Sequence, residues 1–444
     1  MYRTLGRTLF GLLLLSMPAS ADTVSSFTLD NGLQVVVIED HRTPVVTQMV
    51  WYKIGRADEV AGHSGIAHFF EHLMFKGTEK VPSGEFSATV EKQGGNDNAF
   101  TSQDYTAYFQ RVAADRLDLM MQMESDRMVN LNMSEEDVTT ERQVILEERG
   151  QRTDSDPGSL LQEQMSAAQF LNHPYGTPVI GWRAEIAGLT REDAINFYRA
   201  YYAPNNAILV VAGDVKPDDV LALAQKHYGP LPPSDKILSR ERPQEPPQLA
   251  ERRMVLADER VAQPYIARTY LAPERNPGDQ KQAAALAVLA DLLGGSGTNS
   301  VLTKALQFET KTAVYSTAYY DGTSVDPQTF GLVVVPAEGV SLADAEAEMD
   351  KTIAKFLQDG VNADDFARIK TQIRAGQIYA RDDAGGLANT YGQALAVGLS
   401  VKDVQNWPDV LQAVTPEEVM AAAKLVFNRD QAVTGWLTTK EAAQ

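Results

Sequence analysis

The sequence predicts an α+β protein made of two duplicated domains of similar size, each a mostly antiparallel sheet packed with helices. Three observations support this fold class. The 444-residue chain, with 44% apolar and 22% charged residues, is long enough for two or three globular domains. Strand-like and helix-like patterns occur in a similar order in both halves. A segment with six prolines and dense charge, residues 228–253, separates the halves and lacks helical or strand periodicity.

The first 21 residues have the pattern of a secretory signal peptide. Arg3 and Arg7 precede an apolar run from Leu9 to Leu15, and the small residues Ala19–Ser20–Ala21 follow. Cleavage after Ala21 would release an exported, periplasmic protein, and no lipid anchor is expected because residue 22 is aspartate. No later apolar segment reaches the roughly 20 residues of a membrane-spanning helix, so stable membrane insertion is not expected.

Strands and helices are then expected on both sides of a linker. Residues 22–229 form the expected N-terminal domain, residues 230–252 the linker and residues 253–444 the C-terminal domain. The first domain has strand patterns at 33–40, 45–53 and 206–214 and a helical pattern at 115–128. The second has strand patterns at 264–273, 312–320 and 328–336, a helical pattern at 281–295 and two long helical segments between 341 and 379. This partial recurrence makes a duplicated domain plausible.

Composition restricts the partners. The chain has no cysteine, so disulfides cannot stabilise it after export. The formal net charge is −19, and removal of the two signal-peptide arginines makes it −21 (−19 − 2). Such acidity argues against nucleic acid as a partner and mildly favours basic ligands.

Two of the six histidines indicate a metal site. If residues 64–76 form a helix that ends at Gly77, His68 and His72 project from one face about 6 Å apart. Two imidazoles at this spacing can share one Zn²⁺, and Glu71 beside them can reach a metal-bound water. The order H-x-x-E-H is the zincin arrangement reversed. The alternative is an apolar helix with two satisfied core histidines, and the glutamate inside the motif argues against it.

A third ligand is expected in "TTERQVILEERG", residues 139–150, on a probable helix. Glu141 and Glu148 are almost two turns apart and share a face, whereas Glu147 points roughly 100° away. The residues alone leave both Glu141 and Glu148 as candidates. The alternative is a solvated acidic face, which is the preferred interpretation for Glu147.

These motifs resemble those of the pitrilysin and insulinase family of inverted zinc metallopeptidases, most closely its processing-peptidase branch. The resemblance rests on "HFFEHLMFKGT" and "ERQVILEE", whose last glutamate follows His72 by 76 residues. Further matching segments are "NGLQVVVIED", "GGNDNAFTSQDYTAYF", "HPYGTPVIG" and "YYAPNNAILVVAGD", so the similarity extends over nearly the whole mature chain.

The resemblance implies a role for each residue of the motif. It implies one Zn²⁺ per chain with His68, His72 and Glu148 as ligands and Glu71 as the general base. Glu141 corresponds to a glutamate that orients the ligands.

The resemblance also implies where substrate lies. An extended peptide would pair with the strand of Asn98, Ala99, Phe100 and Thr101 through main-chain hydrogen bonds. The alternative is that this strand has only a structural role and pairs within the sheet. For the neighbouring Tyr105 and Tyr108 we expect packing in the core. His63 has no counterpart and is expected at the surface or near the helix start.

One position departs from the family pattern. Self-sufficient members carry an arginine and a tyrosine seven residues apart in the C-terminal domain, where they approach the substrate. Here Tyr315 is present, but Phe308 occupies the arginine position, and neither Lys304 nor Lys311 has the right spacing. The expected consequence is a heterodimer in which a paralogous subunit without the zinc motif supplies the pair. A homodimer or monomer is the alternative.

The sequence therefore predicts an exported zinc endopeptidase that acts on peptides or unfolded polypeptides through a metal-activated water. A non-catalytic scaffold or binding subunit of the same family is the first alternative. A zinc hydrolase with a non-peptide substrate is the second, and no recognition element for such a substrate is present.

Overall fold

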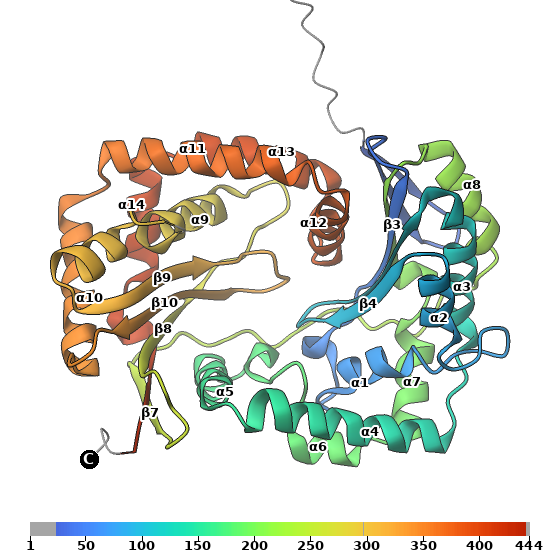
Figure 1. Cartoon of the computed structure of the whole chain (residues 1–444), viewed down its shortest axis with the longest axis horizontal. Coiled ribbons are helices and arrows are strands. Elements are labelled where there is room, and N and C mark those ends of the chain that lie inside the picture. Colours follow the sequence, from blue (N-terminus) through green and yellow to red (C-terminus); the bar gives the residue numbers. More distant parts are fainter. Residues whose placement is uncertain (1–23, 296, 441–444) are drawn as a thin grey trace, which may run out of the picture.

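The computed structural model describes residues 24–295 and 297–440, and the predicted signal peptide at 1–21 lies outside them. The described residues form two sheets with helices packed on both, one sheet in each half of the chain (Figure 1). The expected α+β class with two domains of similar size is confirmed. Among the described residues, no helix is both long and apolar enough to cross a membrane.

The two sheets share one topology. The first consists of β1 (Val24–Thr28), β2 (Gln34–Glu39), β3 (Val45–Tyr52), β4 (Asn96–Thr101), β5 (Thr106–Ala113) and β6 (Ala207–Gly213), in the order β1-β2-β6-β3-β5-β4. The second consists of β7 (Arg252–Ala257), β8 (Tyr265–Ala272), β9 (Ala313–Tyr320), β10 (Gln328–Pro336) and β11 (Ala432–Thr438), in the order β7-β11-β8-β10-β9. Among the strands of the described residues, only β2/β6 and β7/β11 pair in parallel. Without β1 the two orders match strand for strand, as a duplication requires.

The helices divide between the halves. The N-terminal half has α1 (Ile66–Leu73), α2 (Glu85–Lys92), α3 (Leu117–Asn130), α4 (Glu135–Arg149), α5 (Pro157–Gln169), α6 (Arg183–Gly188), α7 (Arg191–Tyr201) and α8 (Pro217–His227). The C-terminal half has α9 (Lys281–Gly294), α10 (Leu342–Asp359), α11 (Ala363–Ala380), α12 (Ala384–Ala396), α13 (Val401–Ala413) and α14 (Pro416–Val426). Short 3₁₀ and π turns are η1 (Arg56–Asp58), η2 (Ala114–Arg116), η3 (Gly150–Asp154), η4 (Pro174–Gly176), η5 (Pro204–Asn206), η6 (Thr303–Glu309) and η7 (Arg429–Gln431).

The helix expected at 64–76 is shorter than predicted, because α1 has only eight residues. Gly65 precedes it with φ 89°, and an added Cβ there would lie 2.5 Å from the carbonyl oxygen of Ile180. This left-handed, tightly packed position prevents an earlier helix start. After Leu73 the chain turns through Gly77, whose φ is 92°.

The sheet of each half is covered by a helix that belongs to the other half (Figure 1). Tyr391 and Leu395 of α12 are buried against Met49 and Trp51 on the first sheet. In the opposite direction, α5 buries Leu161 and Met165 against Ala267, Val433 and Leu437 on the second sheet. The two halves are therefore one packing unit.

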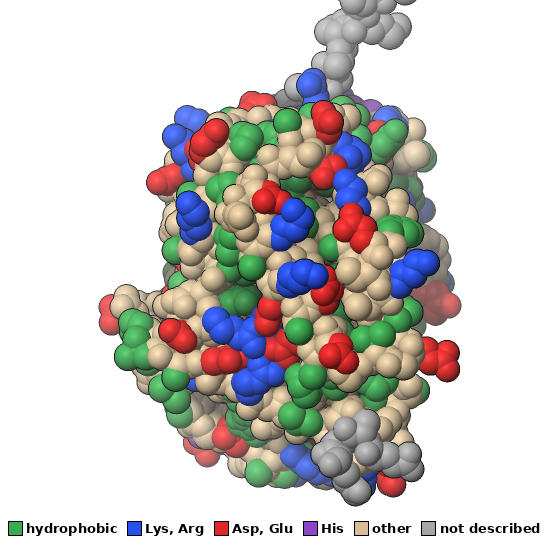
Figure 2. All heavy atoms as spheres, turned by 90° about the vertical axis from the view of Figure 1, so that its left-hand side faces the viewer, with side chains coloured by type: hydrophobic (Ala, Val, Ile, Leu, Met, Phe, Trp, Pro, Cys, Tyr) green, Lys and Arg blue, Asp and Glu red, His purple; other side chains and the backbone are tan. Residues whose placement is uncertain are grey.

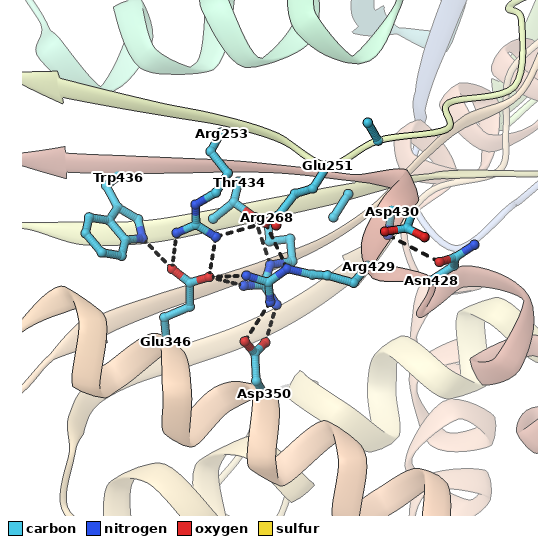
Figure 3. A network of polar contacts seen from close by, with 12 residues as sticks. Glu251, Arg253, Arg268, Glu346, Asp350, Asn428, Arg429, Asp430, Thr434 and Trp436 are labelled. Carbon is cyan, nitrogen blue, oxygen red and sulfur yellow. Dashed lines mark hydrogen bonds and ion pairs between the residues drawn. The ribbon is translucent and has the colours of Figure 1, made fainter.

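Charged side chains stabilise the outer side of the C-terminal half. Glu346 on α10 is buried and accepts hydrogen bonds from Arg253, Arg268, Arg429 and the indole of Trp436 (Figure 3). On the surface of this side, Lys and Arg lie interspersed with Asp and Glu, and apolar side chains occur between them (Figure 2).

Candidate metal centre

The helix α1 presents its two histidines on one face. Its apolar residues, Ile66, Ala67, Phe69, Phe70 and Leu73, are buried. The rings of His68 and His72 lie on the other side with their centroids 4.9 Å apart.

The buried carboxylate of Glu59 fixes the start of α1. It accepts hydrogen bonds from the backbone N–H groups of Gly65 at 2.9 Å and Ala67 at 2.8 Å. Burial raises the pKa of Glu59 to about 8, although Arg56 and these two N–H groups act in the opposite direction. Sequence reasoning missed this residue, because its partners are backbone groups.

The third donor comes from α4, which begins with a capping box of Ser134 and Asp137. Oε2 of Glu148 lies 3.7 Å from Nε2 of His68 and 3.4 Å from Nε2 of His72. These three residues offer ligand atoms that all lie within 4.8 Å of one another. The structure thus brings together the three residues that the family resemblance implies as ligands.

The chemistry of this group fits a zinc ion. Oε2 of Glu148 is buried and has no hydrogen-bond partner in the described part of the chain, and a cation between the three donors would satisfy it. Burial, followed by the charges of His72 and Arg152, lowers the pKa of His68 to about 3, which favours the neutral imidazole that ligates metals. Two imidazoles and one carboxylate are a typical donor set for catalytic zinc.

Glu141 fixes the orientation of the His72 ring. Nδ1 of His72 donates to Oε2 of Glu141 at 3.2 Å, which leaves Nε2 directed at Glu148. Lys76, one turn after His72, lies 2.5 Å from the other carboxylate oxygen of Glu141. The hydrogen bond with His72 and the contact with Lys76 lower the pKa of Glu141. Sequence reasoning missed Lys76, which lies three residues after the end of α1.

Glu71 lies beside the donor group and not within it. Its Oε2 accepts a hydrogen bond of 2.5 Å from the hydroxyl of Thr101, the last residue of β4. Burial raises the pKa of Glu71, against the opposing effect of Thr101. Thr101, expected to contact substrate, therefore orients Glu71.

A cavity of about 550 Å³ opens above these groups. It is lined by His68, Glu71, His72, Asn98, Ala99, Val144, Glu147, Glu148, Gln151 and Arg152. Asn98 and Ala99 belong to β4, which is an edge strand and pairs on one side only within the part of the chain that the structure describes. Glu147 is exposed, as its position on the helix suggested. Nη1 of Arg152 lies 2.6 Å from Oε1 of Glu148.

The structure places the remaining candidates away from the donors. Phe100 packs against Trp51 with ring centroids 5.3 Å apart. Nε2 of His63 lies 3.5 Å from Asp193. Phe308 and Tyr315 are 55% and 52% exposed in the C-terminal half, and all the residues lining the cavity in the described chain belong to the N-terminal half.

Two buried tyrosines near β4 have the expected packing role. Tyr105 packs against Trp51, with ring centroids 5.0 Å apart. The hydroxyl of Tyr108 lies 2.9 Å from that of Tyr202 inside the N-terminal core.

Comparison with known proteins relates this geometry to a family. Residues 34–182 match the family model described as Insulinase (Peptidase family M16), and residues 188–373 match that of the Peptidase M16 inactive domain. A Helicobacter pylori protein named zinc protease PqqE is 30% identical over 415 residues, which cover 93% of this chain and 92% of that protein. A probable mitochondrial-processing peptidase subunit beta of Schizosaccharomyces pombe is 31% identical over 212 residues, which cover 48% of this chain and 46% of that protein.

Solved structures give the same result. A Helicobacter pylori protease superposes with a TM-score of 0.88 at 29% identity, covering 94% of this chain and all of that one. The periplasmic protease PqqL of Escherichia coli has the same fold, with a TM-score of 0.81 at 22% identity, covering 95% of this chain and 48% of PqqL. The chain therefore belongs to the insulinase family of zinc proteases, peptidase family M16.

Proposed function

We propose that this protein is an exported zinc endopeptidase that hydrolyses peptides or unfolded polypeptides, with Glu71 as the general base. The observation that carries this proposal is the convergence of His68, His72 and Glu148 beside Glu71, at the open edge of β4. Export is supported by the signal-peptide pattern of residues 1–21, and a periplasmic location would follow from it.

The catalytic step assigns separate tasks to these residues. His68, His72 and Glu148 would hold the zinc ion, which when bound polarises a peptide carbonyl and lowers the pKa of a water molecule. Glu71 would accept a proton from the attacking water and deliver it to the nitrogen of the leaving amine. Because Thr101 occupies Oε2 of Glu71, Oε1 is the oxygen available for this proton transfer. The raised pKa of Glu71 suits a group that must both accept and release a proton near neutral pH.

An extended peptide would be held by the backbone of β4. No strand of the described chain pairs with its outer side, and peptides commonly add to such an edge as a further strand. Asn98 and Ala99 line the cavity, so a peptide paired with them would pass the metal centre. Binding through the main chain favours substrates that are already unfolded.

A paralogous subunit without the zinc motif would complete the substrate site in a heterodimer, and a homodimer is the alternative. The proposal is supported by Phe308 at the position where an arginine is expected and by a cavity lined from the N-terminal half alone. A relative named as the beta subunit of a processing peptidase also supports a multi-subunit arrangement. Tyr315 would still face the substrate from the C-terminal half.

Metal analysis combined with peptide cleavage tests the proposed function. His68→Ala and Glu148→Gln should lose zinc and activity together, because each removes one of three donors. Glu71→Gln should keep zinc and the fold but lose most turnover. His63→Ala is the matched control and should retain both. Stoichiometric zinc without cleavage of any peptide, alone or with a paralogous subunit, would refute the peptidase, and absence of bound zinc would favour a scaffold.

A further inference from the structure

We propose that Arg152 binds substrate and selects peptides that carry a carboxylate beside the bond to be cut. The carboxylate could belong to an aspartate or glutamate side chain or to the end of the peptide chain. This inference rests on the proposed peptidase function and names the substrate class of the same site.

The backbone at Arg152 is held in place by its surroundings. It lies in the π-helical turn η3, which follows α4 directly and is closed by a hydrogen bond from Ser155 N to the carbonyl of Gly150 at 3.0 Å. Asp154, at the end of this turn, contacts Arg149 at 3.4 Å and Arg183 at 3.2 Å. Such turns place side chains where a regular helix would not, frequently at functional sites.

The guanidinium of Arg152 is only partly used by the protein. One nitrogen, Nη1, contacts Oε1 of Glu148, while Oε2 of the same carboxylate faces the two histidines. The side chain is 77% exposed and lines the cavity, and no other partner is found for it among the described residues. Its remaining N–H groups are therefore available, and a planar guanidinium binds a carboxylate through two parallel hydrogen bonds.

The charges of the cavity explain why a carboxylate would depend on this residue. Glu71, Glu147 and Glu148 line the same space, and Arg152 is the single Lys or Arg among the described lining residues. With zinc bound but without Arg152, three carboxylates against one divalent cation would leave the cavity with a net negative charge that opposes the entry of a further carboxylate. A peptide paired with Asn98 and Ala99 would lie between β4 and the wall formed by Gln151 and Arg152.

Two matched sets of peptides test this proposal with zinc-loaded protein. One set has glutamate or glutamine at successive positions around a fixed cleavage site, and the other ends in a free carboxyl group or an amide. The wild type should cleave the carboxylate member of one set with a kcat/KM about tenfold higher or more, mainly through a lower KM. Arg152→Gln should lose this preference while keeping its zinc, and Arg152→Lys should retain part of it. The set that shows the effect identifies the source of the carboxylate.

Arg183→Gln is the matched control, because Arg183 contacts the same turn but does not line the cavity. It should keep the wild-type preference. An unchanged preference for the carboxylate peptide in Arg152→Gln would overturn the proposal. An equal decrease of kcat/KM for all peptides together with loss of zinc would also overturn it, because Arg152 would then act only on Glu148.

A protein that cleaves no peptide would refute the proposed function without deciding the role of Arg152. Dissociation constants of the same peptides for zinc-loaded wild type and Arg152→Gln then give the answer. The proposal is supported if the wild type binds the carboxylate peptide more tightly than its neutral partner and Arg152→Gln does not. It is overturned if the wild type binds both peptides equally.

Discussion

Nη1 of Arg242, in the linker, lies 2.6 Å from Oδ1 of Asp104, three residues after the end of β4. Arg242 also contacts Asp58 at 2.6 Å in the N-terminal half and Asp326 at 2.9 Å in the C-terminal half. Its side chain is only 4% exposed. The linker thus fixes the loop after β4 relative to both halves.

We expect Arg242→Leu to destabilise the protein by about 3–5 kcal/mol, because it leaves the carboxylate of Asp104 buried without its cation and leaves Asp58 with only the cation of Arg240, at 3.3 Å. Urea denaturation followed by circular dichroism measures the change. Arg260→Leu removes an exposed pair with Asp258 and two hydrogen bonds to the carbonyls of Asp154 and Ser155, and should destabilise the protein clearly less. Equal effects of the two substitutions would contradict the structural role of Arg242.

Glu141→Gln should weaken zinc binding by about 10- to 100-fold, because the His72 ring loses the charged partner that orients it. Lys76→Met should weaken zinc binding in the same direction, because Glu141 loses the contact that holds its other carboxylate oxygen. Competition with a chelator measures this affinity. Lys80→Met is the control, since Lys80 pairs with Asp126 and does not line the cavity. Unchanged zinc affinity in both Lys76→Met and Glu141→Gln would show that His72 needs no external orientation.

The same substitution at two glycines should have opposite effects. A Cβ at Gly392 of α12 would lie 2.0 Å from Nε1 of the buried Trp51, so Gly392→Ala should destabilise by about 1–3 kcal/mol. Gly376 of α11 has nothing within 4 Å of such a Cβ, so Gly376→Ala should stabilise by about 0.5–1 kcal/mol. Thermal melting of both variants measures these changes. Melting temperatures that shift in the same direction would contradict the close packing of α12.

Glu346 should contribute a pH-dependent part of the stability. Burial opposes the effect, but Arg253 and Arg268 lower the pKa of Glu346 to about 2 from an ordinary value of 4.5. A carboxylate with a lowered pKa contributes stability above its unfolded pKa, and this contribution is lost as pH falls from about 4.5 to about 2.

The free energy of unfolding of Glu346→Gln should therefore decrease less over this pH range than that of the wild type, although the variant is less stable at neutral pH. Denaturation at a series of pH values measures the difference. Glu348→Gln, which removes a partner of Lys351 on the same helix, should retain the wild-type pH dependence. The prediction fails if Glu346→Gln and wild type lose stability in parallel.

Because Phe308 occupies the position where an arginine is expected, we expect low peptidase activity from the isolated chain. Phe308 offers no hydrogen-bond donor to substrate, so peptide cleavage should rise when a paralogous subunit that carries the Arg–Tyr pair is added. Turnover measured with and without that subunit, over a range of dilutions, tests the expectation. Full activity of the dilute isolated chain would rule out the proposal that a second subunit completes the substrate site.

Local patterns predicted much of the fold. The strand expected at 328–336 coincides with β10, and the helix expected at 281–295 differs from α9 by one residue. Both segments have apolar patterns that are decided within a few residues. Gly65 shortened α1 because its backbone packs against Ile180, a contact that sequence spacing does not reveal.

The candidate site was predictable to the same degree. The spacing of His68 and His72 located the centre, whereas its third donor required the resemblance to known peptidases. Lys76 and Arg152 were missed because their roles depend on which carboxylates lie near them in the folded chain. The covering of β3 by α12 was also missed, since the two are separated by most of the chain and the segment "AGGLANTYGQALA" has no strong pattern of its own.

The packing of Tyr391 against Trp51 also sets the order in which the chain can fold during synthesis. These residues are 340 positions apart (391 − 51). The apolar face of the first sheet that contains Trp51 can therefore be covered only after most of the protein has been synthesised. At about 5–20 residues per second, the delay on the ribosome is about 17–70 s. Within the described chain, the opposite face of this sheet packs against N-terminal residues alone, so only the face that α12 covers stays open during this interval.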